Sequence, residues 1–326
     1  MNRREFIANS ATAAALGASF SGKQNLWAQT LADVHLEIAP LKLEIAPGKH
    51  VETIAYNGKV PGPLIRWPEG KSITIDVSNQ TNVPEIVHWH GLWIPSDQDG
   101  AMEEGSPMIA PGAHLRYQFT PRPSGLRWYH THSMAGHDFK KGLYSGQFGC
   151  FYIEPKSELC GYDQEIFLTL HDWNAYMGAA TDASMDVSYD YSTINDRMLE
   201  AGVPIQVMQD QRVIFRVVNA SATATHWLAL AGHEMILVAM DGNPVPIPAN
   251  ITALRLAPAE RADVLVDMKN PGAWILGETR EDIRKAGMGI VIEYAGREGE
   301  PKWIDPPEML WSYRPFAHPE AAAIPP

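Results

Sequence analysis

The stretch GKSITIDVSN, residues 70–79, alternates the apolar side chains of Ile73, Ile75 and Val77 with polar ones. A repeat of two residues places the apolar side chains on one face, so this stretch predicts a strand that is buried on one side. Many short strands separated by turn residues predict an all-β sandwich or barrel. One stretch of this kind precedes it, LKLEIAPGK (41–49), and four follow it: EIVHWHGLWI (85–94), HLRYQFTP (114–121), GLRWYHTH (125–132) and GQFGCFYIEP (146–155).

The second half of the chain repeats the first. GKSITIDVSN aligns with DQRVIFRVVN (210–219), HWHGL (88–92) with HWLAL (226–230), and MIAPGAHLRYQF (108–119) with RLAPAERADVLV (255–266). A duplication of this kind predicts two domains of one fold. The second copy keeps the first histidine and the tryptophan of HWH but carries Leu228 in place of the second histidine.

We expect the first domain over residues 31–157 and the second over residues 158–297. The segment 298–326 follows them and is rich in proline, which favours extended chain. It is therefore expected to be a connector or tail that does not pack against either domain.

Composition and charge argue against two kinds of partner. The chain has 326 residues, of which 45% are hydrophobic and 20% charged, as in globular proteins. Its formal net charge of −12 argues against nucleic acid and against an anionic membrane surface as partners.

The first thirty residues predict export. Arg3 and Arg4 precede Phe6 and an alanine-rich stretch, a pattern typical of a bacterial twin-arginine signal peptide. We expect residues 1–30 to be removed, which leaves a periplasmic protein without a membrane anchor. The periplasm would permit a disulfide between Cys150 and Cys160, and the sequence leaves that pairing open.

Two His-x-His pairs lie in apolar, aromatic strands, in HWH (88–90) and YHTH (129–132). On a strand, residues two apart point to the same side, about 6–7 Å from each other. His88 and His90 therefore project together, as do His130 and His132, and on neighbouring strands all four imidazoles converge. Imidazole suits copper, zinc, nickel or iron, so these spacings predict a metal site without choosing the metal.

The residues around the pairs resemble a known family. HWHGLWIPSDQDGA (88–101), APG (110–112), WYHTH (128–132) and GLYSGQFG (142–149) resemble the first two copper motifs of multicopper oxidases of the laccase-like and copper-efflux types. The second half resembles the middle domain of that family in FRVVNAS, HEMILVAMDG and LAPAERADVLV. The resemblance implies two tandem cupredoxin-like Greek-key domains and copper as the cofactor.

The resemblance also implies a role for each residue that matches a motif. His88 would bind the type 2 copper, and His90, His130 and His132 would bind the pair of type 3 coppers. Asp99 matches a carboxylate that delivers protons during reduction of O₂ to water, although Asp-Gly is also a common turn. The substrates would be O₂ and a small reductant or metal ion.

Half of the trinuclear copper ligands of this family, and its type 1 copper site, are not found in the sequence. The family carries a His-x-x-His-x-His motif and a His-Cys-His run in a third cupredoxin domain, and neither cysteine here has flanking histidines. We therefore expect a partial trinuclear site, completed by a third domain or by another chain. The alternative is a periplasmic cupredoxin-like protein that binds copper or a partner without catalysis. A two-domain copper nitrite reductase is disfavoured because His-Thr-His stands where its His-Cys motif would be.

Overall fold

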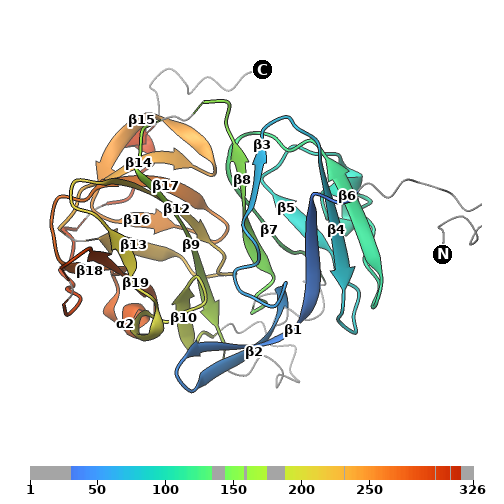
Figure 1. Ribbon diagram of the computed structural model, residues 1–326, viewed down its shortest axis with the longest axis horizontal. Coiled ribbons are helices and arrows are strands. Elements are labelled where there is room, and N and C mark those ends of the chain that lie inside the picture. Colours follow the sequence, from blue (N-terminus) through green and yellow to red (C-terminus); the bar gives the residue numbers. More distant parts are fainter. Residues whose placement is uncertain are drawn as a thin grey trace, which may run out of the picture. The chain divides into compact units, whose positions relative to one another are not determined.

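The computed structural model describes residues 31–133, 144–157, 160–174, 188–230, 232–297, 299–308 and 310–316. The predicted signal segment, residues 1–30, lies outside them. As the alternating pattern predicts, the described chain is all-β (Figure 1). The first half forms two four-stranded sheets. One has the order β2 (Lys49–Tyr56), β1 (Val34–Ala46), β4 (Ile73–Asn79), β6 (His114–Phe119), and the other β3 (Ile65–Pro68), β8 (Phe148–Glu154), β7 (Gly125–Thr131), β5 (Val87–His90).

The second half forms a six-stranded and a five-stranded sheet. The larger has the order β10 (Tyr191–Ile194), β9 (Gln164–Trp173), β12 (Arg212–Asn219), β17 (Arg261–Asp267), β14 (Met235–Met240), β15 (Asn243–Ile251). The smaller has the order β11 (Ile205–Val207), β19 (Gly289–Tyr294), β18 (Ala273–Glu278), β13 (His226–Leu230), β16 (Leu254–Leu256). The helical segments are short: η1 (Ser96–Gln98), η2 (Met102–Glu104), η3 (Leu199–Ala201), α2 (Glu281–Lys285) and η4 (Arg314–Phe316).

The two halves share one topology, which confirms the internal repeat. The order β1-β4-β6 recurs as β9-β12-β17, and β3-β8-β7-β5 recurs as β11-β19-β18-β13. Side chains at equivalent positions also make equivalent hydrogen bonds. The buried amide of Asn79 donates to Val83 and Ile109, and that of Asn219 donates to Ala224 and Leu256.

Each half encloses its own apolar core. In the first half, Trp89 and Tyr129 face inward with ring centroids 5.9 Å apart and no exposed surface. Because neighbouring residues on a strand face opposite sides, burying these two rings turns His88, His90 and His130 to the other face of the sheet. The core therefore fixes which way the histidines point.

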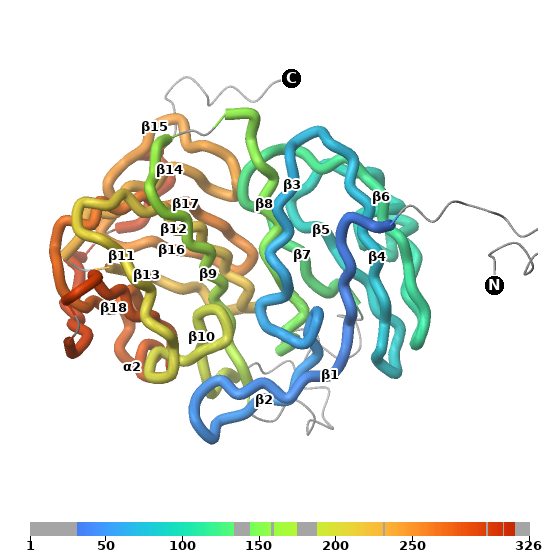
Figure 2. Tube along the Cα trace, in the orientation of Figure 1, coloured from blue at the N-terminus to red at the C-terminus, as the bar shows by residue number. Residues whose placement is uncertain are grey.

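A third apolar cluster joins the halves. It combines Trp128 and Phe148 of the first half with Trp173, Val218 and other residues of the second. Strands β8 and β9, which are consecutive, lie side by side at this junction, as the chain path in Figure 2 shows. Arg127 is also part of the junction, since its guanidinium donates hydrogen bonds to the main-chain oxygen of Asp241 and to the side chain of Asn243.

The end of the described chain corrects one expectation. The prediction that residues 298–326 do not pack is wrong for their described part. Phe316 is buried in the second core, Trp311 packs against it, and Lys302 forms a main-chain bridge with Trp274. The proline count favoured extended chain but did not show that two aromatic side chains anchor it.

Two further features concern the cysteines and the helices. Cys150 and Cys160 are not joined by a disulfide, and Cys150 is buried. Among the described helices, none has the length and apolar character needed to cross a membrane.

Candidate metal centre

The register of β5 and β7 brings the two His-x-His motifs together. In this antiparallel pair His88 lies opposite His130, and His90 lies opposite Trp128. Directly opposed residues on neighbouring strands share a face. Three histidines and one tryptophan therefore occupy one patch of the sheet, close to the junction between the two halves.

The ring nitrogens converge. One nitrogen from each of His88, His90 and His130 lies within 4.8 Å of the others, and Nδ1 of His90 is 3.3 Å from Nε2 of His130. The ring of His132 lies near the same place, with its centroid 5.4 Å from that of His88 and 6.2 Å from that of His130. Strand β7 ends at Thr131, so His132 stands just beyond it and is exposed.

Main-chain oxygens orient two of the rings. Nδ1 of His88 is 2.8 Å from the carbonyl oxygen of Asp99, and Nδ1 of His130 is 2.8 Å from that of Thr131. A carbonyl only accepts, so each Nδ1 carries the proton and each Nε2 keeps its lone pair. Metal-binding histidines are typically held in this manner. The donor set thus fits a metal that prefers imidazole, such as copper.

Burial keeps the cluster neutral. Burial lowers the pKa of His88, and it lowers that of His130 well below the ordinary value with help from the neighbouring His88 and His90. Burial and the nearby Arg261 cation lower the pKa of His90 to about 3. Neutral imidazoles present lone pairs at neutral pH, which is the state that metal binding requires.

Asp99 lies beside His88. Its main-chain oxygen accepts from His88 and also from the amide of Trp89, at 3.3 Å, and one carboxylate oxygen is 3.6 Å from Nδ1 of His88. Burial raises the pKa of this carboxyl. The turn interpretation and the proximity to the cluster therefore both hold for Asp99.

Gly100 allows this turn to press against β5. It has a φ of +79°, and a Cβ added there would lie 1.9 Å from the main-chain oxygen of Val87. We expect Gly100→Ala to lower the free energy of unfolding by about 3 kcal/mol, because the turn must move and the conformation is strained. Urea unfolding followed by tryptophan fluorescence measures this.

Gly112→Ala is the matched control for that variant. Gly112 has a similar φ of +72° but nothing within 4 Å of an added Cβ. We expect a loss of about 1 kcal/mol there, from strain alone. Equal losses in the two variants would show that the contact between Gly100 and β5 does not matter.

A cavity of about 350 Å³ adjoins the cluster. Its first wall contains the four histidines of the two motifs together with Trp128, whose ring centroid is 4.2 Å from that of His130. Its second wall comes from the other half of the chain. The residues of that wall are His171, Ala220, Ser221, Ala222, Pro258 and Ala259. Spacing along the sequence gave no indication that His171 faces the same cavity as the two motifs.

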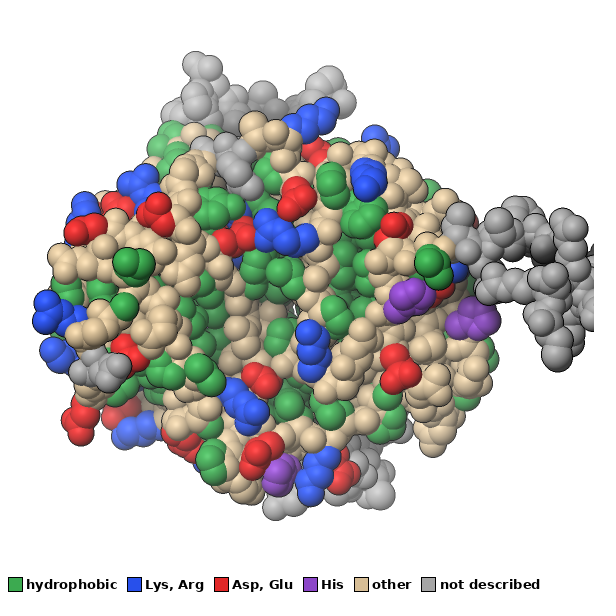
Figure 3. Space-filling model, viewed as in Figure 1, with side chains coloured by type: hydrophobic (Ala, Val, Ile, Leu, Met, Phe, Trp, Pro, Cys, Tyr) green, Lys and Arg blue, Asp and Glu red, His purple; other side chains and the backbone are tan. Residues whose placement is uncertain are grey.

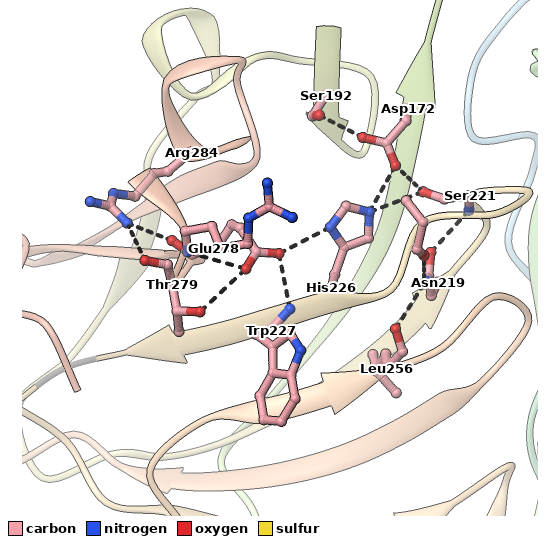
Figure 4. Close-up of polar contacts among 12 residues, drawn as sticks. Asp172, Ser192, Asn219, Ser221, His226, Trp227, Leu256, Glu278, Thr279 and Arg284 are labelled. Carbon is pink, nitrogen blue, oxygen red and sulfur yellow. Dashed lines mark hydrogen bonds and ion pairs between the residues drawn. The ribbon is translucent and has the colours of Figure 1, made fainter. Parts of the chain in front are cut away.

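The second copy of the motif has a different chemistry. His226, equivalent to His88, is fully buried between two carboxylates, with Nε2 2.8 Å from Asp172 and Nδ1 3.1 Å from Glu278 (Figure 4). The hydroxyls of Ser192 and Ser221 donate to Asp172. Burial alone would lower the pKa of His226, but the hydrogen bonds and charges of the two carboxylates raise it to about 9. This histidine is an imidazolium that uses both nitrogens, so it has no lone pair for a metal.

Comparison with known proteins places the chain in a family context. Residues 37–158 and residues 164–292 each match a family model described as multicopper oxidase. Multicopper oxidase MmcO of Mycobacterium tuberculosis is 29% identical over 83% of this chain and 58% of its own length. Copper resistance protein A of Escherichia coli is 26% identical over 95% of this chain and 59% of its own length. The chain thus spans about three-fifths of the length of these curated relatives.

Solved structures share the fold. A blue copper oxidase from Nitrosomonas europaea superimposes with a TM-score of 0.74 at 28% identity, over 80% of this chain and 85% of that one. A copper nitrite reductase from the same organism superimposes with a TM-score of 0.72 at 20% identity, over 82% of this chain and 97% of that one, which shows a common fold only.

Proposed function

This chain belongs to the multicopper oxidase family, and we propose that its four clustered histidines form one half of a trinuclear copper site that reduces O₂ to water. The observation that carries the proposal is the convergence of one ring nitrogen from each of His88, His90 and His130 within 4.8 Å. In this proposal His88 binds a type 2 copper, and His90, His130 and His132 bind type 3 coppers. Bound copper would supply the one-electron chemistry.

The protein groups around the cluster have separate tasks. The carbonyls of Asp99 and Thr131 hold the rings of His88 and His130 in one orientation. Reduction of O₂ to water consumes protons, and in this proposal the Asp99 carboxyl delivers them, which its distance of 3.6 Å from Nδ1 of His88 and its raised pKa support. The ring of Trp128 packs against those of His90 and His130, with centroids 5.1 Å and 4.2 Å away.

The rest of the site would come from elsewhere. We propose that a third cupredoxin domain or another chain supplies the remaining copper ligands and the entry point for electrons from a small reductant or a metal ion. The chain itself contributes two cupredoxin-like domains, residues 31–157 and 158–297. The face in Figure 3 mixes acidic and basic side chains, which with the net charge of −12 supports a partner other than nucleic acid. Export to the periplasm rests on Arg3 and Arg4.

A second candidate is a copper-binding protein without oxidase activity. Among the described residues, His88, His90 and His130 are the single group of three or more that could hold a metal ion. Neither cysteine stands beside a histidine in the sequence. A site for electron entry would then be lacking in this chain.

Copper content, the visible spectrum and O₂ consumption of the full chain test the proposal. We expect bound copper without an intense blue band, because that band requires a copper–thiolate bond. O₂ consumption with an added reductant, above that of free copper, would favour the oxidase over the second candidate. A chain that binds no copper would overturn both, and an intense blue band would show a thiolate site that we do not propose.

Asp99→Asn separates the two tasks of that residue. The main-chain carbonyl that holds His88 remains, so we expect copper affinity to change by less than about tenfold. The variant lacks the carboxyl that would carry protons, so the rate of any O₂ reduction should fall. Competitive copper titration of the variant measures the first effect. A loss of affinity as large as that of His88→Gln would contradict this division of roles.

A further inference from the structure

A histidine on the second wall of the cavity has an unused ring nitrogen. His171, on β9, lines the cavity beside the cluster although its side chain comes from the other half of the chain. The residue is only 2% exposed, and its Nε2 is buried without a hydrogen-bond partner. Leaving a buried polar atom unpaired is costly, so such an atom calls for an explanation.

The hydrogen bond at Nδ1 of His171 decides which ring nitrogen carries the proton. Nδ1 of His171 is 2.9 Å from the main-chain oxygen of Ala220. Because a carbonyl accepts and cannot donate, Nδ1 carries the proton and Nε2 carries a lone pair. His88 and His130 are held in the same way, each with Nδ1 on a carbonyl oxygen. Three histidines that line one cavity therefore share the arrangement typical of metal ligands.

The strand directions explain why His171 can reach the cavity. Its neighbour Asp172 turns inward to the buried His226, and consecutive residues on a strand face opposite sides. His171 consequently faces the first half, where its ring centroid lies 4.7 Å from that of Phe148. Phe148 is the cross-strand partner of His130. His171 is thus one side chain removed from the cluster.

We propose that His171 is a fifth copper-binding imidazole, which binds an ion in the cavity through Nε2 from the wall that the second half of the chain contributes. The inference rests on the proposed copper-binding function. It gives this chain a ligand from its own second half. The other residues of that wall are Ala220, Ser221, Ala222, Pro258 and Ala259, which offer no competing imidazole, thiolate or carboxylate. Water or histidines of the first wall would supply the other ligands of the ion.

The test compares His171→Gln with His50→Gln in the full chain. Glutamine keeps bulk and polarity, and His50 is an exposed histidine on β2, away from the cavity lining. Copper(II) titration with a competing chelator should show, for His171→Gln alone, either one copper fewer or at least about a tenfold loss of affinity at one site. Pulsed EPR should show fewer imidazole nitrogens coupled to copper.

Unchanged copper binding in His171→Gln, together with an unchanged number of imidazole nitrogens coupled to copper, would overturn the inference while leaving the proposed function intact. A wild-type chain that binds no copper would overturn the proposed function itself.

Discussion

Replacing His130 with glutamine is expected to lower the copper affinity of the full chain by about a hundredfold or more. His130 occupies the centre of the cluster, since its Nε2 is 3.3 Å from Nδ1 of His90 and it lies directly across from His88. Glutamine cannot supply an imidazole lone pair to copper. Titration with copper(II) against a chelator of known affinity measures the change.

His114→Gln is the matched control for this variant. His114 begins β6 in the other sheet of the first half and is exposed. Its replacement should leave copper affinity unchanged, and circular dichroism should show that both variants fold. If the two variants bound copper equally well, His130 would not be a ligand.

Replacing His226 with glutamine is expected to destabilise the chain by about 3–5 kcal/mol. The imidazolium is buried between Asp172 and Glu278, and both carboxylates are almost fully buried. Without it, two carboxylates remain in the second core with no cation between them. Urea unfolding measures the loss, with His50→Gln as the surface control. A loss below about 1 kcal/mol would show that the carboxylates are neutralised in another way.

The same network predicts how wild-type stability depends on pH. The pKa of His226 rises from an ordinary value of 6.5 to about 9 on folding, so its contribution is fully present below pH 6.5 and is lost as the pH rises through 9. We expect the contribution of His226 to the free energy of unfolding to fall by about 3 kcal/mol between these limits. Burial alone would raise the pKa of Asp172, but its bond to His226 lowers it, so its contribution is lost only when the pH falls below the ordinary value of 3.8.

The pH window from about 7.5 to 9 isolates His226. The cavity histidines with lowered pKa values, such as His90 and His171, are neutral in the folded chain but titrate near 6.5 in the unfolded chain, so their opposite slope has faded by about pH 7.5. Unfolding experiments at several pH values from about 7.5 to 9 should show a falling stability for the wild type and a nearly flat profile for His226→Gln. Parallel profiles would contradict the assignment of a charged imidazole to this position.

Much of the fold could be predicted from local patterns. The period-two alternation of GKSITIDVSN and its counterparts predicts strands, and the repeat predicts that the order β1-β4-β6 returns as β9-β12-β17. The pairing of His88 with His130 follows from placing the two motifs on neighbouring strands of one sheet. These features depend on residues near one another in the chain or on duplication.

Other features depend on contacts between distant residues. In the sequence, His171 belongs to no His-x-His pair, and only the packing of β9 against β8 turns it toward the cluster. The sequence also shows that HWL (226–228) lacks the second histidine. It does not show that Asp172 and Glu278 make His226 a buried cation. Trp311 and Phe316 bury part of a segment whose prolines favoured an unpacked connector.

The central claim is that copper binds to the imidazole cluster of the first half. Anomalous diffraction at the copper absorption edge, from crystals of the full chain loaded with copper, tests it most directly. We predict anomalous density for copper in the cavity, within bonding distance of ring nitrogens of His88, His90 and His130. Copper found elsewhere, with no peak at these three nitrogens, would contradict the account.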